Sequence, residues 1–121
     1  MRIQDSLQTI LNSVDGLESI MIIDSYCSIV TTIGKSNKTQ LGAIQGYKAI
    51  CDQVKKFQIG NLKSLSLIYE NKTLVFLRFN LLTVIMIADI KVSGQYLVEL
   101  RDKFNPIIEE CLQASTILKE I

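Results

Sequence analysis

The segment from residue 62 to 88 contains three apolar runs that most constrain how this chain can fold. The runs are separated only by the polar residues 70–72 and by Asn80. Connections this short leave room only for hairpins, so the runs predict an antiparallel three-stranded meander. The second and third runs, Leu74–Phe79 and Leu81–Ala88, are apolar at both alternating positions, which is typical of strands covered on both faces. The rest of the chain must therefore supply amphipathic elements that pack on this sheet.

The first run of the meander has a different pattern. Leu65, Leu67 and Tyr69 alternate with mostly small polar residues, as in a strand near the edge of a sheet. An edge strand with aliphatic and aromatic side chains tends to associate with other chains unless something covers it. We therefore expect another protein to cover residues 62–70.

The N-terminal part of the chain predicts a helix and a hairpin. Apolar residues at helical spacing predict a helix over residues 2–13, ended by Gly16 in the left-handed conformation of a C-cap. Ser19–Asp24 and Ser28–Ile33 then predict two strands, joined by the turn residues 25–27.

A second helix is predicted from an N-cap at Thr39 to Phe57. Its apolar residues spread over about 140° of arc, more than in the first helix. This width has two explanations: deep burial within the chain's own fold, or contact with both the sheet and a partner. The small residues Gly42 and Gly46 would let another element approach closely.

The last element is a helix that follows an N-cap at Ser93. Its apolar residues between 97 and 111 lie within about 100° of arc. Pro106 predicts a kink near Asp102–Asn105, and residues 112–121 either prolong the helix or fray. The order α-β-β-α-β-β-β-α predicts an α+β fold with one five-stranded antiparallel sheet, in a single domain of residues 1–121.

Composition and charge exclude several classes of protein. The 121 residues are 48% hydrophobic, which is typical of a globular chain with one core. The net charge of +1 gives no basic excess for binding nucleic acid. The apolar runs are far shorter than the roughly 20 residues that span a bilayer, and the N-terminus lacks the apolar core of a secretory signal. We expect a cytoplasmic protein with no direct membrane insertion.

The sequence also argues against catalysis. It contains no histidine, which excludes the usual Ser-His-Asp and Cys-His nucleophile systems. Cys27, Cys51 and Cys111 are widely spaced among apolar residues, so we expect reduced thiols rather than a disulfide or a metal site. Asp24 and Asp89 end apolar strands, where carboxylates usually cap turns. We expect no enzyme activity, no cofactor and no metal.

Several short motifs along the chain carry a family resemblance. They are the turn Val14-Asp15-Gly16-Leu17 after the first helix, Ile59-Gly60-Asn61, Phe79-Asn80-Leu81 and the closing Pro106-Ile107-Ile108-Glu109-Glu110-Cys111-Leu112. Together with the order of the elements, these motifs resemble the roadblock (dynein light chain) family, and within it the MEK-binding scaffold subunits of Ragulator complexes. The resemblance covers essentially the whole chain and implies a roadblock/profilin-like fold.

The resemblance also implies how the protein meets a partner. Roadblock proteins dimerise by laying their second helices side by side and by pairing their third strands into one continuous sheet. This favours a partner as the reason for the wide apolar stripe of the second helix. The implied partner interface consists of Ile44, Tyr47, Lys48 and Cys51 on that helix and of Leu65, Leu67 and Tyr69 on the strand.

The implied function is that of a non-catalytic scaffold or adaptor. The protein would form a heterodimer with a second roadblock-type subunit. A membrane-anchored Ragulator-type subunit would hold the pair on the cytosolic face of late endosomes or lysosomes. Rag-type GTPases, in nutrient (TOR) signalling, and MEK and ERK kinases are the further implied partners. The alternative is a homodimeric roadblock adaptor, either a dynein light chain or a platform that regulates small GTPases.

Overall fold

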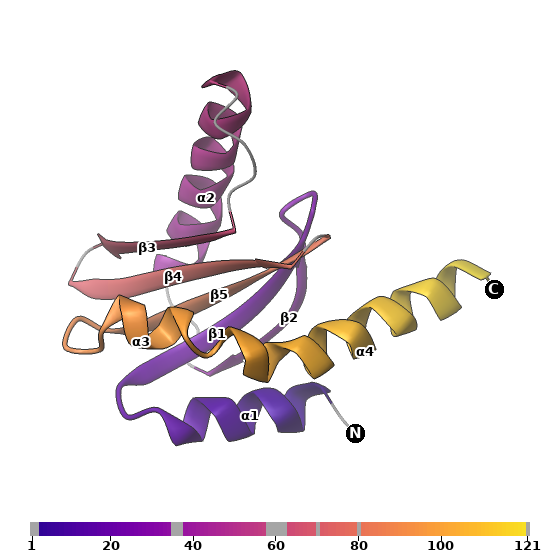
Figure 1. Ribbon diagram of the computed structural model, residues 1–121, viewed down its shortest axis with the longest axis horizontal. Helices are drawn as coiled ribbons and strands as arrows, with labels where there is room; N and C mark the ends of the chain where they lie inside the picture. Colours follow the sequence, from indigo (N-terminus) through magenta and orange to yellow (C-terminus); the bar gives the residue numbers. More distant parts are fainter. Residues whose placement is uncertain (1–2, 35–37, 58–62, 70, 80, 121) are drawn as a thin grey trace.

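The computed structural model describes residues 3–34, 38–57, 63–69, 71–79 and 81–120 (Figure 1). Its element order confirms the predicted α+β fold, except that the last helix is divided in two. The elements are α1 (Ile3–Ser13), β1 (Leu17–Asp24), β2 (Ile29–Gly34), α2 (Lys38–Phe57), β3 (Ser64–Tyr69), β4 (Lys72–Phe79), β5 (Leu82–Asp89), α3 (Gly94–Val98) and α4 (Arg101–Glu120).

The five strands form one antiparallel sheet in the order β2-β1-β5-β4-β3. Three of the four strand pairs are hairpins between consecutive strands. The fourth pair, β1 with β5, joins distant parts of the chain and places Leu17 opposite Ala88 and Asp24 opposite Leu82. The edges of the sheet are therefore β2 and β3, which confirms the predicted edge position of β3.

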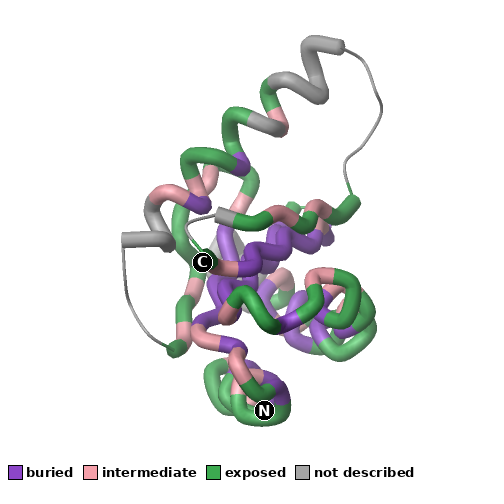
Figure 2. Tube along the Cα trace, turned by 90° about the vertical axis from the view of Figure 1, so that its left-hand side faces the viewer, coloured by how far each residue is buried: buried purple, intermediate pink, exposed green. Residues whose placement is uncertain are grey.

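Helices cover both faces of the sheet. In Figure 1, α1, α3 and α4 lie on one face, and α2 crosses the other. Along β4, Val75 and Leu77 pack with α1, α3 and α4, whereas Leu74 and Phe76 pack under α2. This division explains why residues 74–77 of the strand are all apolar, and Figure 2 shows the buried residues concentrated in the strands.

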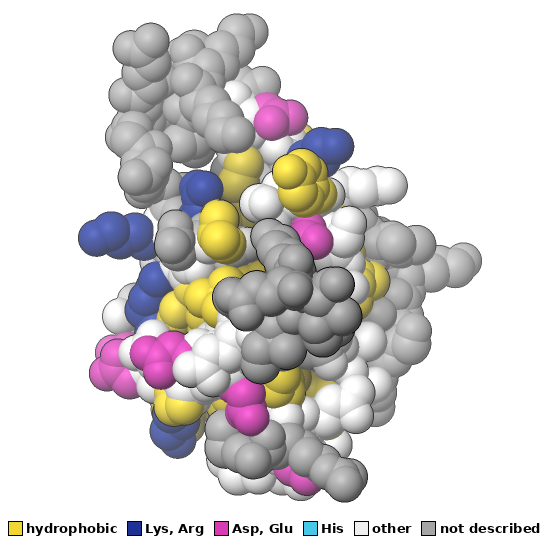
Figure 3. Space-filling model, turned by 90° about the vertical axis from the view of Figure 1, so that its right-hand side faces the viewer, with side chains coloured by type: hydrophobic (Ala, Val, Ile, Leu, Met, Phe, Trp, Pro, Cys, Tyr) yellow, Lys and Arg dark blue, Asp and Glu magenta, His cyan; other side chains and the backbone are white. Residues whose placement is uncertain are grey.

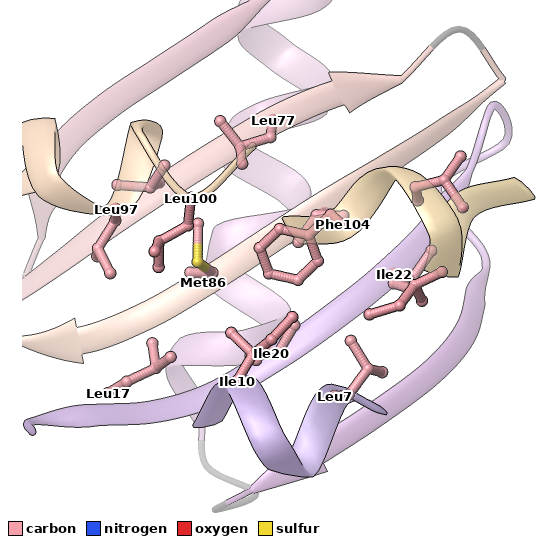
Figure 4. Packing of buried hydrophobic residues seen from close by; sticks show 14 of the residues in the cluster. Leu7, Ile10, Leu17, Ile20, Ile22, Leu77, Met86, Leu97, Leu100 and Phe104 are labelled. Atoms are coloured by element: carbon pink, nitrogen blue, oxygen red, sulfur yellow. The ribbon is translucent and has the colours of Figure 1, made fainter. Parts of the chain in front are cut away.

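The larger core lies between the sheet and the helices α1, α3 and α4. Side chains from α1, β1, β5 and α4 converge around the fully buried ring of Phe104 (Figure 4). Arg101 fixes the start of α4 above this core. Its guanidinium lies 4.4 Å from the ring centroid of Phe79 and donates hydrogen bonds to the carbonyls of Arg78 and Lys63.

Gly16 has the predicted left-handed conformation, with φ +94°. Its carbonyl accepts from the Asp89 N–H at 2.8 Å, and an added Cβ would lie 2.7 Å from Cγ2 of Val92. The turn after α1 therefore depends on glycine for both its dihedral angle and its close approach to Val92.

Replacement of Gly16 by alanine is expected to lower the free energy of unfolding by about 1–2 kcal/mol, because a side chain is strained at positive φ. Urea denaturation of both proteins measures the difference. The exposed Asp15→Ala variant in the same turn is the control, with an expected change of about 0.5 kcal/mol or less. An unchanged midpoint for Gly16→Ala would contradict this account of the turn.

The two aspartates at strand ends cap turns, as predicted. The Asp24 carboxylate accepts from the N–H groups of Tyr26 at 2.8 Å and Ser28 at 3.0 Å, and that of Asp89 accepts from the Lys91 N–H at 3.0 Å. These hydrogen bonds hold the ends of β1 and β5 in place.

The C-terminal helix is divided in two before the predicted kink at Asp102–Asn105, and the kink itself stays a prediction. The Ser93 N-cap is confirmed, because its hydroxyl accepts from the Tyr96 N–H. The helix then breaks at residues 99–100, before the expected kink, and Pro106 lies inside α4. The break lets Leu97, Leu100 and Phe104 all point into one core. Beyond residue 112 the helix continues.

Thr39, the predicted N-cap of the second helix, lies within α2 rather than before it, because α2 begins at Lys38. None of the helices among the described residues is both long and apolar enough to cross a bilayer.

Candidate partner interface

The helix α2 lies on its own on one face of the sheet and reaches past the edge of it. In Figure 1, α2 crosses the sheet and its C-terminal part extends beyond β3. The core beneath α2 is formed by Ala43 and Tyr47 of the helix and by residues of β1, β4 and β5. Part of the helix therefore has no sheet beneath it within the described chain.

Tyr47 attaches α2 to the sheet. Its side chain is only 5% exposed, its ring stacks on Phe76 with centroids 4.9 Å apart, and its hydroxyl lies 3.2 Å from Oγ1 of Thr83. Burial raises the pKa of the Tyr47 hydroxyl, so the group remains a neutral hydrogen-bonding partner. Tyr47 thus points toward the protein's own core.

The other predicted interface residues flank this core. Ile44 and Cys51 on α2, and Leu65 and Leu67 on β3, are half-buried at its border. Lys48 is exposed. Tyr69 lies on β3 opposite Lys72, but its side chain is outside the described part of the structure. The structure thus brings α2 and the apolar face of β3 together on one side of the sheet, and their role in binding a partner stays a prediction.

Gly46 lies on the outer side of α2. A Cβ atom added there would meet no other atom within 4 Å. Glycine inside a helix costs about 1 kcal/mol relative to alanine, and no contact described within this chain requires it. The bare backbone at Gly46 would allow another helix to approach closely.

A cavity of about 340 Å³ lies beside α2, next to the turns that join β1 to β2 and β4 to β5. Its charged groups are balanced, with Lys48 and Arg78 against Asp24 and Asp52. Burial raises the pKa of the Cys27 thiol, although Lys48 opposes this effect. A thiol with a raised pKa is a poor nucleophile at neutral pH. The cavity is lined by Asp24, Ser25, Tyr26, Cys27, Tyr47, Lys48, Cys51, Asp52, Arg78, Leu81 and Thr83.

The cysteines and acidic residues form no metal centre in the part of the chain that the structure describes. All three cysteines are free thiols. Within the described residues no group of three or more Cys, Asp or Glu side chains is placed to hold a metal ion.

In Figure 3, hydrophobic side chains form separate patches with both signs of charge between them.

The sequence did not indicate two exposed apolar side chains that lie in turns beside the cavity. Tyr26 is 85% exposed and Leu81 is also exposed, and both border the cavity beside α2. The available signal was a large apolar residue at a turn position, where small polar residues are usual.

Comparison with known proteins identifies the family. The model of the family described as "Mitogen-activated protein kinase kinase 1 interacting" matches residues 1–115. The search of curated proteins finds no match.

Three solved structures share the fold. The roadblock/LC7 domain from Streptomyces avermitilis has a TM-score of 0.69 and 7% identity, over 93% of this chain and 97% of that one. Myxococcus xanthus MglB has a TM-score of 0.64 and 16% identity, over 90% and 89%. Myxococcus xanthus MglC has a TM-score of 0.59 and 17% identity, over 91% and 99%. At these identities the likeness concerns the fold.

The family match covers nearly the whole chain, and the structural neighbours confirm the fold that the motifs implied. The protein is therefore a member of the mitogen-activated protein kinase kinase 1 interacting family, with a roadblock fold.

Proposed function

We propose that this protein is a non-catalytic adaptor that forms a heterodimer with a second roadblock-type subunit through α2 and β3. The observation that carries the proposal is the extension of α2 past the open β3 edge (Figure 1). A partner strand paired with β3 would lie beneath the extended part of α2. The helix and the edge strand would then contact the partner together.

The backbone of β3 can accept such a strand. The Lys63 carbonyl accepts from the Arg78 N–H at 2.8 Å, so the backbone groups of residue 63 point toward β4. Because these groups alternate along a strand, those of Leu65 and Leu67 also point toward β4, and those of Ser66 and Ile68 point outward. Strand addition at these outward groups would extend the sheet across two subunits.

Side chains would determine which partner binds. Leu65 and Leu67 are half-buried on the α2 face of the strand, and Ile44 is half-buried on the helix. Covering the remaining apolar area of these residues would favour association through the hydrophobic effect. The bare backbone at Gly46 would let the partner's helix lie close to α2. Tyr47 would support this surface from below rather than touch the partner.

The wider assembly forms a second part of the proposal. A membrane-anchored Ragulator-type subunit would hold the dimer on the cytosolic face of late endosomes or lysosomes, where it helps recruit Rag-type GTPases. The sequence resemblance supports these partners and also ERK. The family description names mitogen-activated protein kinase kinase 1, which supports MEK as a partner of this chain.

The experiment is co-expression with a second roadblock-type subunit, followed by light scattering and affinity measurement. Ile68→Pro removes one outward N–H and leaves the bonds to β4 intact, so the dimer should weaken at least about tenfold, which corresponds to 1.4 kcal/mol. The matched control Ile68→Thr keeps the N–H and a β-branched side chain, and should dimerise like the wild type.

Two outcomes would contradict the proposal. One is a chain that stays monomeric with each roadblock-type subunit tested. The other is a heterodimer whose affinity is unchanged by Ile68→Pro. A stable homodimer of the protein alone would favour the alternative, a homodimeric roadblock adaptor.

A further inference from the structure

The other edge of the sheet, β2, has no charged or proline side chain to protect it, although a bulge at Val30 interrupts its pairing with β1. Natural edges carry lysine, proline or inward-pointing charges that prevent pairing with other chains. The β2 sequence, IVTTIG, has none of these. Ile29 is 50% exposed and Val30 is 47% exposed. Beyond the bulge, residues 31–34 pair regularly with β1, and this part of the strand resembles a site for strand addition more than a protected edge.

One hydrogen bond shows which backbone N–H and C=O groups of β2 point away from β1. The Asp24 N–H donates to the Ser28 carbonyl at 3.0 Å, so the backbone N–H and C=O groups of Asp24 point toward β2. By alternation Ile22 and Ile20 do the same, and they lie opposite Thr31 and Ile33. The backbone groups of Thr32, between these two residues, therefore point outward.

A groove runs beside this edge on the face covered by α1 and α4. It has a volume of about 430 Å³ and is lined by Ile3, Gln4, Asp5, Val30, Thr31 and Cys111. Three of the six lining residues, Ile3, Val30 and Cys111, are apolar and provide a contact for an aliphatic side chain. Asp5 is the charged residue in this lining and is exposed, so it would favour a basic residue nearby.

The opposite face of the edge is also apolar. Ile29 lies opposite Ile23, whose side chain belongs to the core beneath α2. The exposed Tyr26 lies in the turn that precedes the strand. An added strand would therefore find apolar contacts on both of its faces.

We propose that β2 binds an extended apolar segment of another polypeptide, carrying a basic residue, as a sixth strand of the sheet. A second copy of this chain fits less well. The β2 strand of a second copy has no basic residue that could lie near Asp5, and it would place only Val30 and Thr31 in the groove. The α1 helix of that copy would also approach the edge of the sheet where Ile3–Asp5 of the first copy already lie. Because β2 and β3 are opposite edges, this site stays accessible when β3 pairs with a partner.

The probe is a fluorescein-labelled peptide, Lys-Thr-Val-Thr-Leu-Thr-Val-Lys, added to the full chain and followed by fluorescence anisotropy. Saturable binding is expected. Thr32→Pro, which removes an outward N–H, should weaken it at least about tenfold, whereas the control Thr32→Val should not. A peptide with aspartate in place of the central leucine should bind at least about tenfold more weakly, because half of the groove lining is apolar and Asp5 is acidic.

Ile68→Pro at the opposite edge separates this proposal from the dimer proposal. It should leave peptide binding unchanged even where it prevents dimerisation, and Thr32→Pro should leave the dimer intact. Peptide binding that is insensitive to Thr32→Pro, or absent at millimolar peptide, would overturn the proposal. So would self-association of the chain that Thr32→Pro abolishes, since the occupant of β2 would then be a second copy.

Discussion

Replacement of Tyr47 by alanine is expected to lower the free energy of unfolding by about 3–5 kcal/mol, the range for truncating a buried aromatic residue. The substitution removes the stacking on Phe76 and the hydrogen bond with Thr83, and leaves a cavity between α2 and the sheet. Urea denaturation followed by circular dichroism measures the loss. The part of α2 that extends past β3 should then also lose the Tyr47 contacts that attach the helix to the sheet.

Tyr47→Phe is the matched control. It keeps the ring and removes only the hydroxyl, so the expected cost is about 1 kcal/mol. It should leave affinity for a roadblock-type partner unchanged, because the side chain faces the protein's own core. A Tyr47→Phe variant with wild-type stability and tenfold weaker partner binding would instead place this residue in direct contact with the partner.

The second large effect is expected at Gly94, at the start of α3. An alanine Cβ there would lie 3.1 Å from the Ser66 Cβ and closer still to its Oγ. Such overpacking typically costs about 1–3 kcal/mol. The Ser66 hydroxyl can rotate away, but the Ser66 Cβ is held in place by the backbone of β3. We expect Gly94→Ala to lower the free energy of unfolding by about 2–3 kcal/mol.

Ser66→Ala provides a direct check on this cause. It removes the Oγ atom, so the double variant should recover about 1 kcal/mol or more relative to Gly94→Ala alone. Thermal denaturation of the four proteins of the cycle measures the coupling. Additive effects would mean that the contact between Gly94 and Ser66 does not limit the packing of α3 on β3.

The strands were predictable because their pattern is local. Alternation in Leu65 and Leu67 identified the edge strand, and the continuous apolar run of β5 identified a strand covered on both faces. Asp24 and Asp89 act within their own turns, so their capping role also follows from the local sequence.

Contacts between residues far apart in the chain explain the features that the sequence pattern could not predict. A stripe of about 140° on α2 does not say which residue faces the sheet, and only the stacking on Phe76 identifies Tyr47 as the anchor. The tight contact between Gly94 and Ser66 joins residues far apart in the chain. Pro106 suggested a kink, whereas the break at residues 99–100 follows from the packing of Leu100 and Phe104.

The pairing of β1 with β5 has a consequence for the order of folding. The β1–β2 hairpin and the β3–β4–β5 meander can each form from neighbouring residues, but the ladder between them closes the longest loop in the sheet. Such non-local pairing slows folding. During synthesis β1 emerges well before β5, so the inner edge of a nearly fully buried strand stays open until the meander is complete. The newly made chain therefore passes through a stage with an aggregation-prone apolar edge, before either outer edge can meet its partner.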